Sequence, residues 1–443
     1  MDAFRITGGT RLSGRIRVDG SKNAALPEMA AALMAQTPVQ LRGLPQLSDI
    51  DNMVTLMTEL GCEIERDGED VRIVNSGNGS WHARYEIVKT MRASICVLGP
   101  LLARYGKARV AMPGGCAIGD RPVDLHLRGM EALGATVELD GGDIVVEAKR
   151  LKGATVFLGG PFGSTVLGTA NVMCAATHAE GVTVIESAAC EPEIMDLADM
   201  LNRMGASITG AGTPRITIRG KGSLQGCDHR VMPDRIVAGT IAIASAITNG
   251  DVIIDDFPYD HLLAVIDRLN ATGVRVHRED EAQPASRCTV KVTSDRRLEP
   301  VLFTTQPYPG FPTDLQAQMM TLLCFADGNS IVTEKIFPDR FLHVSELVRM
   351  GAKVYRQGGT VVVQGVQRLV GAPVMASDLR GSASLVLAGL AAEGETTVSR
   401  IYHLDRGYCH LETQLNSLGA QIERFDPDAT VAASEDKIKS TSY

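Results

Sequence analysis

A short phrase recurs six times along this chain. In each copy an amphipathic segment ends at a glycine and runs directly into a segment of alternating apolar residues. The copies read LMTELGCEIE, MEALGATVEL, MLNRMGASIT, RLNATGVRVH, LVRMGAKVYR and LNSLGAQIER, with their glycines at positions 61, 134, 205, 273, 351 and 419. Such a glycine predicts a helix C-cap in the left-handed conformation, followed by a half-buried strand. The spacing of 68 to 78 residues indicates a structural repeat of about 70 residues.

Each repeat also contains an earlier, more uniformly apolar helix. These segments are SKNAALPEMAAALMA, TMRASICVLGPLLA, STVLGTANVMCAATHA, DRIVAGTIAIASAIT, FPTDLQAQMMTLLCFA and DLRGSASLVLAGLAA. Because they are apolar on most faces, we expect them to lie inside the protein, covered by sheets and by the amphipathic helices. The repeat therefore predicts an α/β unit with the order helix, strand, helix, strand and a further short strand.

The length of the chain favours two domains of three units each. A chain of 443 residues exceeds the roughly 250 to 300 at which a single core stops growing. We expect the first domain to span 22–232, because the fourth unit starts near VMPDRIVAGT. The strand-like start ITGGTRLSGRIRVDG precedes the first buried helix, so we assign 1–21 together with 233–424 to the second domain. The polar stretch 425–443 is predicted to be a flexible tail.

Composition excludes several classes of function. The net charge of −8 argues against a protein that coats nucleic acid or an anionic membrane. The nine cysteines show no C-x-x-C or Cys/His ligand spacing, so we expect no disulfide framework, no metal site and no cofactor. The start of the chain has no apolar signal core, and no run of about 18 apolar residues follows. These features favour a cytoplasmic protein.

Cationic residues gather at the predicted starts of the buried helices. A helix start offers unpaired N–H groups and a positive dipole end, so it favours anions. Lys22 and Asn23 begin the first such helix, Arg92 the second and Arg380 the sixth, while other arginines lie in loops, namely Arg121, Arg340 and Arg406. Structural ion pairs with a neighbouring aspartate remain an alternative for the arginines of DRP, SDLRG and LDRGY. If these cations converge between the domains, they form a cleft suited to a phosphate and a carboxylate.

The segment AMPGGCAIGDRPVDLH, residues 111–126, is the sharpest local signal. Three glycines surround Cys116, and Arg121 follows five residues later. A cysteine in a Gly-rich loop beside a cation is a candidate reactive thiol, although an exposed incidental thiol remains the alternative. Cysteines inside apolar helices are expected to be buried hydrophobes, namely Cys96, Cys174 and Cys324.

A second polar loop, PYPGFPTDLQAQ, places Asp314 near a helix start. Helix capping is the ordinary role of an aspartate at such a position, and catalysis is the alternative. The histidines that follow polar loops are expected to be structural, namely His126, His343 and His403.

Taken together, these phrases resemble the UDP-N-acetylglucosamine 1-carboxyvinyltransferase family of enolpyruvyl transferases. The similarity covers nearly all of residues 1–424 and includes GSKNAALP, VKTMRAS, PGGCAIGDRPVDLH, CEPEIMDLA, MPDRI, FPTDLQAQ, DRFLHVSELVRMGA, SDLRGSASLVLAGL and IYHLDRGY. The resemblance implies two inside-out α/β barrel-like domains with the active site in the cleft between them. It also implies phosphoenolpyruvate and UDP-N-acetylglucosamine as substrates, and addition followed by elimination of phosphate as the reaction.

The resemblance further implies roles for individual residues. Cys116 would be the acid and Asp314 the base, with Lys22 and Arg406 also in the catalytic group. Phosphoenolpyruvate would be bound by Lys22, Asn23, Arg92, Arg121, Arg340, Arg380 and Arg406. The UDP-sugar would be bound by Asn23, Arg92, Arg121, Pro122, Val123, Asp124, Leu125, Thr165, Asp314 and Ile336.

Two positions depart from the family pattern. Gly163 stands roughly where the family has a lysine near the nucleotide diphosphate, and Asp120 replaces a small residue before Arg121. These departures keep a catalytically weak, UDP-sugar-binding paralogue open as an alternative. A transferase acting on shikimate 3-phosphate is the nearest alternative enzyme, and Cys116 with the RPVDLH segment argues against it.

Overall fold

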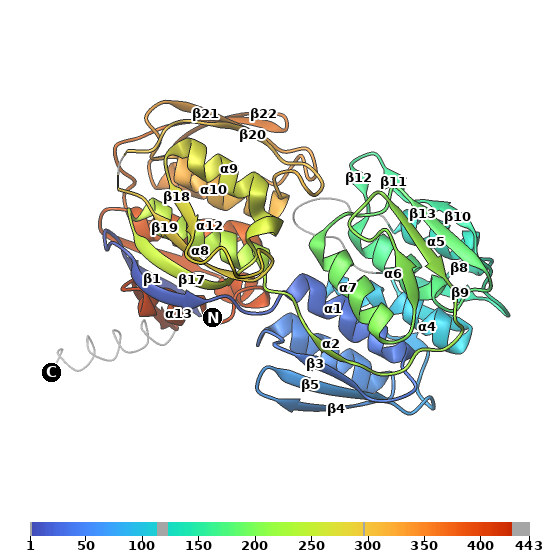
Figure 1. Ribbon diagram of the computed structural model, residues 1–443. Helices are drawn as coiled ribbons and strands as arrows, with labels where there is room; N and C mark the ends of the chain where they lie inside the picture. The colour runs from blue at the N-terminus through green and yellow to red at the C-terminus, as the bar shows by residue number, and fades with distance from the viewer. Residues whose placement is uncertain (1, 113–122, 296, 428–443) are drawn as a thin grey trace.

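The computed structural model describes residues 2–112, 123–295 and 297–427, which form two lobes lying side by side (Figure 1). Each lobe has its own hydrophobic core. The core of the first lobe is built from buried residues between Ala24 and Met232. The core of the second lobe combines residues between Phe4 and Val18 with residues between Ile236 and Ile422. We propose the boundaries 22–232 and 1–21 with 233–424 for the two domains that these lobes represent.

Among the described residues, each lobe carries three four-stranded sheets with one shared pairing pattern. The first two strands are parallel, and the second, third and fourth are antiparallel to their neighbours. In the first lobe the orders are β16 (Asp228–Arg230), β3 (Val39–Arg42), β5 (Asp70–Asn75), β4 (Cys62–Asp67); β6 (His82–Ala83), β7 (Lys107–Ala111), β9 (Asp143–Glu147), β8 (Thr136–Asp140); and β10 (Thr155–Phe157), β13 (Val182–Glu186), β15 (Arg215–Arg219), β14 (Ser207–Thr209). In the second lobe they are β2 (Ser13–Arg17), β17 (Asp251–Phe257), β19 (Cys288–Thr293), β18 (Arg275–Arg278); β20 (Leu302–Thr304), β21 (Asn329–Thr333), β23 (Thr360–Gln364), β22 (Lys353–Gln357); and β24 (Pro373–Met375), β25 (Glu395–Ser399), β1 (Ala3–Thr7), β26 (Gln421–Phe425).

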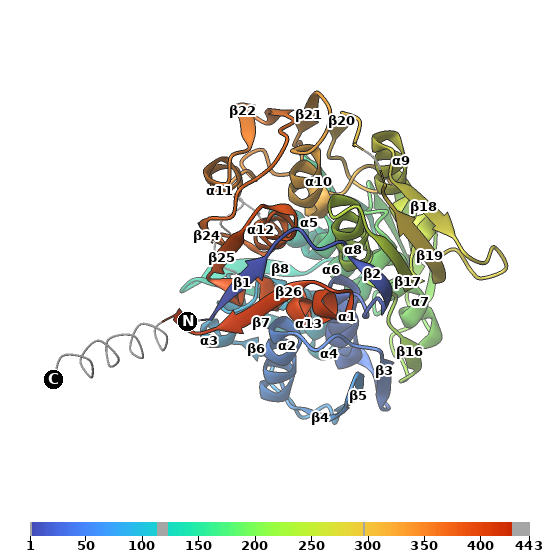
Figure 2. The same cartoon turned by 90° about the vertical axis from the view of Figure 1, so that its left-hand side faces the viewer.

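The apolar helices lie inside each lobe, as their composition predicts, and the sheets surround them (Figure 2). In the first lobe they are α1 (Lys22–Ala31), α4 (Leu98–Tyr105) and α6 (Val166–Ala176), and in the second α8 (Arg235–Ile247), α10 (Gln316–Leu323) and α12 (Leu379–Ala391). Close packing demands glycine where these helices meet. A Cβ at Gly99 of α4 would lie 2.2 Å from the carbonyl oxygen of Asn171 in α6. All thirteen residues of α8 are buried.

The amphipathic helices end as the sequence predicts. They are α2 (Ser48–Glu59), α5 (Asp124–Ala132), α7 (Pro192–Arg203), α9 (Leu263–Thr272), α11 (Val344–Arg349) and α13 (Leu411–Ser417). The six repeated glycines that follow them all have φ between 90° and 103°. The predicted left-handed caps are therefore confirmed at every copy.

Short elements complete the two lobes. They are the helix α3 (Tyr85–Val88), the 3₁₀ turns η1 (Ala32–Met34), η2 (Arg92–Val97), η3 (Tyr259–Leu262), η4 (Thr313–Leu315) and η5 (Ile401–Arg406), and a hairpin of β11 (Gly159–Gly160) and β12 (Gly163–Ser164). The turns η2 and η4 lead directly into α4 and α10, so the second and fifth apolar helices begin with 3₁₀ geometry. No helix in the described part of the chain is long and apolar enough to cross a membrane.

The chain passes between the lobes through two neighbouring segments. Strands β1 and β2 pair with strands of the second lobe, after which the chain enters α1 of the first lobe. It returns after β16, which pairs with β3 and completes the first sheet. The two crossings touch, since the Ser21 N–H donates to the Met232 carbonyl at 2.7 Å. The starts of α1 and α8 are thereby brought together.

Candidate active site

Asp234 joins two buried helix starts that belong to different lobes. One carboxylate oxygen caps α8, accepting from the N–H groups of Ile236 at 2.8 Å and Val237 at 3.0 Å. The other oxygen accepts from the backbone N–H of Lys22, the first residue of α1, at 3.3 Å. The positive ends of two helix dipoles therefore meet at the boundary between the lobes.

The Lys22 side chain lies beside this junction and is paired with Asp49. The distance from Lys22 Nζ to Asp49 Oδ2 is 3.1 Å, and Arg406 of the second lobe reaches Asp49 Oδ1 with its Nε, also at 3.1 Å. Burial lowers the pKa of Lys22; Asp49 opposes this effect, whereas Arg380 and Arg406 add to it. Two cations predicted to bind phosphoenolpyruvate thus share one carboxylate.

Asp314 forms a second, similar centre in the second lobe. Its Oδ1 accepts from Arg340 Nη1 at 2.7 Å, and its Oδ2 accepts from Arg380 Nη2 at 3.0 Å and Nε at 3.2 Å. The carboxylate is about one quarter exposed, whereas both guanidinium groups are buried. The N-cap of the turn η4 is Pro312, so the structure favours a role for the Asp314 carboxylate in the cation cluster over helix capping.

Arg380 is fixed from behind by a polar network. It lies in the first turn of α12, and its guanidinium carbon is 5.3 Å from the centre of the Tyr408 ring. The Tyr408 hydroxyl is 3.0 Å from Thr240 Oγ1 and accepts from Gln318 Nε2 at 3.1 Å. Burial acts against the charge of Arg380, but Tyr408 and Asp314 outweigh it and raise its pKa. Arg380 therefore stays a cation.

Glu334 holds the loop on the other side of Asp314. It is buried, and its oxygens accept from the hydroxyl groups of Thr305 at 2.6 Å and Thr313 at 2.9 Å. The same carboxylate accepts from the backbone N–H of Ile336 at 2.7 Å. The predicted sugar-contacting residue Ile336 is thus tied to the turn that carries Asp314. Nothing in the local sequence distinguishes Glu334 from a surface glutamate.

The remaining described residues of the predicted site lie in the first lobe. Arg92 begins η2, Thr165 is the N-cap of α6, and Val123, Asp124 and Leu125 lie at the start of α5. Asn23 follows Lys22 in the first turn of α1. The starts of two further helices therefore carry predicted substrate-binding residues, although their roles in binding stay predictions.

His126 has its tautomer fixed by Asn171. The Asn171 amide oxygen accepts from Gly99 N–H at 2.8 Å, so its Nδ2 is the donor toward His126 Nδ1 at 2.9 Å. An acceptor Nδ1 carries no proton, which leaves a neutral imidazole with its proton on Nε2. Burial, with help from Arg92, lowers the pKa of His126 to about 4. The structural role predicted for this histidine fits these contacts.

Cys116, Arg121 and Pro122, together with Asp120, lie outside the described residues. The roles predicted for them therefore stay predictions. The described chain stops at Met112 and resumes at Val123, directly before α5.

Gly163, a departure from the family pattern, occupies a tight position. Its φ is 105°, and a Cβ there would lie 2.8 Å from Pro307 Cγ. The β11–β12 hairpin of the first lobe therefore packs directly on the 307–312 loop of the second. Any larger residue would require the hairpin to move away from this loop.

A further cation lies at a buried helix start and is not among the residues predicted for the site. Arg235 is the first residue of α8 and forms a two-pronged ion pair with Glu193, at 2.9 and 3.2 Å. Glu193 lies in α7, so this pair also joins the two lobes. The MPDRI phrase places Arg235 at the start of the fourth buried helix, in the position that Lys22 has in the first. This shared position could have predicted Arg235 as a further cation of the site.

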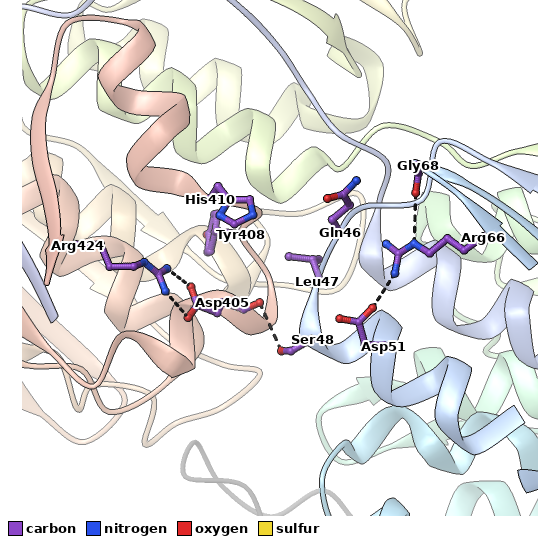
Figure 3. A pocket seen from close by; sticks show the side chains of 10 residues that line it. All are labelled: Gln46, Leu47, Ser48, Asp51, Arg66, Gly68, Asp405, Tyr408, His410 and Arg424. Carbon is purple, nitrogen blue, oxygen red and sulfur yellow. Dashed lines mark hydrogen bonds and ion pairs between the residues drawn. The ribbon is translucent and has the colours of Figure 1, made fainter. Parts of the chain in front are cut away.

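A cavity of about 600 Å³ lies between the lobes and is lined by Gln46, Leu47, Ser48, Asp51, Arg66, Gly68, Asp405, Tyr408, His410 and Arg424 (Figure 3). Its lining includes no residue of the predicted site, although Ser48 and Asp405 are the chain neighbours of Asp49 and Arg406. Its two arginines already pair with carboxylates, Arg66 with Asp51 and Arg424 with Asp405. Because the predicted site residues gather at the cation clusters, we propose that the chemistry takes place there rather than in this cavity.

One group of described side chains has the proximity that a metal site requires. Ligand atoms of Glu28, Asp196 and His229 lie within 4.8 Å of one another in the first lobe. His229 Nε2 is 3.3 Å from Asp196 and 3.5 Å from Glu28. Despite burial, the two carboxyl groups raise the pKa of His229 to about 10. An imidazolium therefore supplies the positive charge between these carboxyl groups.

Comparison with known proteins identifies the family. The model of the EPSP synthase (3-phosphoshikimate 1-carboxyvinyltransferase) family matches residues 6–415. Curated UDP-N-acetylglucosamine 1-carboxyvinyltransferases are more specific relatives. Those of Oleidesulfovibrio alaskensis, Nitratidesulfovibrio vulgaris and Geotalea uraniireducens are 53%, 52% and 50% identical, each over 96% of this chain and 99% of the relative. The chain belongs to this family of enolpyruvyl transferases.

Solved structures confirm the predicted fold class. The enolpyruvyl transferase NikO from Streptomyces tendae superposes with a TM-score of 0.85 at 26% identity, over 96% of this chain and 98% of that one. EPSP synthase from Acinetobacter baumannii gives 0.75 at 19% identity, over 96% and 100%. The two-lobed arrangement of buried helices and outer sheets is thus the enolpyruvyl transferase fold.

Proposed function

We propose that this enzyme transfers the enolpyruvyl group of phosphoenolpyruvate to the 3-hydroxyl of UDP-N-acetylglucosamine and releases phosphate. The observation that carries the proposal, together with family membership, is the convergence of four cations on two carboxylates at the boundary between the lobes. Phosphoenolpyruvate carries both a phosphate and a carboxylate, and such an anion matches a set of preorganised cations.

The two cation clusters suggest a division of labour. Lys22 and Arg406, which meet across the boundary between the lobes, would bind the phosphoenolpyruvate anion together with Asn23, Arg92 and Arg121. Arg340 and Arg380 would neutralise it from the wall formed by the second lobe. Catalysis by charge needs donors that are already in place, and the buried network behind Arg380 provides that rigidity.

Asp314 is our candidate for the base and Cys116 for the acid. Proton transfer from Cys116 to the methylene carbon would make the adjacent carbon electrophilic, and the sugar oxygen would then attack it while Asp314 accepts the hydroxyl proton. Loss of phosphate from the resulting tetrahedral intermediate, with loss of a proton from its methyl group, would restore the double bond. The partial exposure of the Asp314 carboxylate supports access by the sugar hydroxyl.

The family relationship also suggests a setting for the reaction. It would be the first committed step of peptidoglycan precursor synthesis, and thus contribute to cell-wall biogenesis, cell shape and division. We place the enzyme in the cytoplasm, as the cysteine usage of the sequence suggests. UDP-sugar contacts are proposed for Asn23, Arg92, Arg121, Pro122, Val123, Asp124, Leu125, Thr165, Asp314 and Ile336.

The test is phosphate release from phosphoenolpyruvate with three acceptors in parallel: UDP-N-acetylglucosamine, shikimate 3-phosphate and none. Release with the UDP-sugar alone, together with a product heavier by one enolpyruvyl group, would establish reaction and acceptor. Release with shikimate 3-phosphate alone would overturn the acceptor. Absence of release with any of them would favour a UDP-sugar-binding paralogue, and calorimetric titration with UDP-N-acetylglucosamine would then measure binding.

A further inference from the structure

Asp49 is placed so that one carboxylate serves two cations from different lobes. Its side chain is only 3% exposed, and each of its oxygens lies 3.1 Å from a different partner, Lys22 Nζ or Arg406 Nε. It sits in the first turn of α2, where the helix dipole favours a negative charge. The neighbouring Ser48 hydroxyl donates to the Asp405 carbonyl at 3.5 Å. The first turn of α2 thus meets the end of η5.

The positive charges around Lys22 oppose its protonation, so a nearby carboxylate is needed to keep the amine charged. Arg380 of α12 and Arg406 of η5 repel a protonated Lys22, and the side chain is almost fully buried. Asp234 of α8 approaches the backbone N–H of Lys22. Among the described residues, Asp49 is the one carboxylate within ion-pair distance of either the Lys22 amine or the Arg406 guanidinium.

We propose that Asp49 is a positioning residue that keeps Lys22 protonated and holds Arg406 of the opposite lobe beside it, so that the anion site is assembled before phosphoenolpyruvate arrives. This inference deepens the proposed function and rests on it. The carboxylate acts through its two cations and does not touch the reacting atoms. The Arg406 side chain is 41% exposed, so the part of its guanidinium group turned away from Asp49 can meet an incoming phosphate while Lys22 and the Arg406 Nε stay bound to Asp49.

The Asp49→Asn variant separates charge from shape. An amide keeps the size of the side chain but removes the negative charge, so Lys22 loses the interaction that opposes burial. Its pKa falls further, and the amine loses its proton at lower pH. We expect the KM for phosphoenolpyruvate to rise about 100-fold, with a smaller change in kcat. The alkaline limb of the kcat/KM profile should move to lower pH.

The matched control is Asp51→Asn. It makes the same change two residues later on the same helix, at an exposed aspartate that pairs with Arg66. We expect its KM and pH profile to match those of the wild type. Asp49→Glu keeps the charge on a longer side chain, so its pH profile should stay near that of the wild type while its KM rises moderately. If Asp49→Asn does not fold, Asp49→Glu still tests whether the position of the negative charge controls the KM.

A second readout does not depend on catalysis. Competitive acetylation of the whole enzyme with acetic anhydride, followed by peptide mass spectrometry, reports the protonation of each lysine against pH. The Lys22 midpoint should shift to lower pH in Asp49→Asn and remain unchanged in Asp51→Asn and Asp49→Glu. An unchanged midpoint and KM in Asp49→Asn would overturn the inference, as would equal losses in Asp51→Asn. If the wild type transfers no enolpyruvyl group, the proposed function fails, whereas the labelling still tests the charge of Lys22.

Discussion

Asp49 and Asp314 each pair with two cations in the described part of the chain, yet their surroundings differ. Asp49 lies in the first lobe with its side chain 3% exposed, and it bridges the lobes by pairing with Lys22 and Arg406. Asp314 keeps both arginines within the second lobe, and its side chain is 26% exposed. A carboxylate that must exchange a proton with a substrate needs access to it, whereas one that only fixes charges does not. The difference in exposure supports our proposal that Asp314 has the reacting role.

Asp314→Asn should have the largest effect. An amide cannot accept the proton of the sugar hydroxyl, so we expect kcat to fall by about 10³-fold with little change in the KM for phosphoenolpyruvate. Steady-state kinetics of phosphate release would show the split. If Asp314→Asn instead raises KM and leaves kcat intact, the proposed difference in role between Asp314 and Asp49 is wrong, because both carboxylates would then only organise cations.

Glu334→Gln should have an intermediate effect. The amide keeps one acceptor oxygen, which can still accept from Thr305 and Ile336 as Oε1 does, but it replaces Oε2, the acceptor of the Thr313 hydroxyl, with a donor. The turn carrying Asp314 would lose part of its support, and we expect a loss in kcat of about tenfold. Thermal unfolding would separate this loss from global destabilisation. A wild-type kcat would show that Arg340 and Arg380 suffice to position Asp314.

Ser48→Ala should have a small effect and so sharpen the assignment to Asp49. Its hydrogen bond to the Asp405 carbonyl is long, at 3.5 Å, and exposed, so its contribution is at the low end of the usual ~1 kcal/mol. We expect kcat/KM to change by less than about threefold. A loss comparable to that of Asp49→Asn would mean that contact between α2 and η5, rather than charge, controls the site.

His229→Gln should leave activity unchanged but alter stability. Here one cation serves two carboxyl groups, the reverse of the two clusters in the site, and none of the three residues is among the predicted site residues. The raised pKa of about 10 means that His229 stabilises the fold fully below its unfolded pKa of about 6.5, and that this contribution is lost as the pH rises through 10. Burial also raises the pKa of Glu28, to about 8, so its proton uptake acts in the same direction.

The variant should therefore lose about 3–5 kcal/mol at neutral or lower pH, as for a broken buried ion pair, and less near pH 10. Urea unfolding at several pH values would measure this dependence. A loss that grows with pH would contradict the assigned protonation. A change in kcat/KM at a pH where the variant is fully folded would show that this cluster does communicate with the site.

The local sequence pattern was sufficient to predict the six repeats. The preference of helix starts for anions was sufficient to single out most of the cations that lie at the starts of the buried helices. Gly61 and its five equivalents signal their conformation through their position between a helix and a strand. Lys22 and Arg380 follow from the same logic, because the apolar helices that they begin are readily recognised. The contacts between Asp49 and Arg406 could not be predicted this way. These residues lie 357 positions apart, and Asp49 looks like any acidic residue in the first turn of a helix.

The distinction between capping and reacting carboxylates also required the structure. Asp234 and Asp378 cap α8 and α12, whereas the carboxylate of Asp314 turns to two arginines instead. All three precede or begin apolar helices, so their sequence contexts are similar. What separates them is the arrival of Arg340 and Arg380 from elsewhere in the second lobe, which no local pattern encodes.

The position of β1 has a consequence for biosynthesis. This strand, Ala3–Thr7, is synthesised long before both of its partners, β25 and β26. The first lobe is complete once β16 has emerged and can fold while synthesis continues, in line with the tendency of domains to fold as units. The N-terminal strands must meanwhile wait unpaired. The first lobe is inserted between β1 and the partners of β1. The nascent chain must therefore keep β1 from aggregating until those partners have been made.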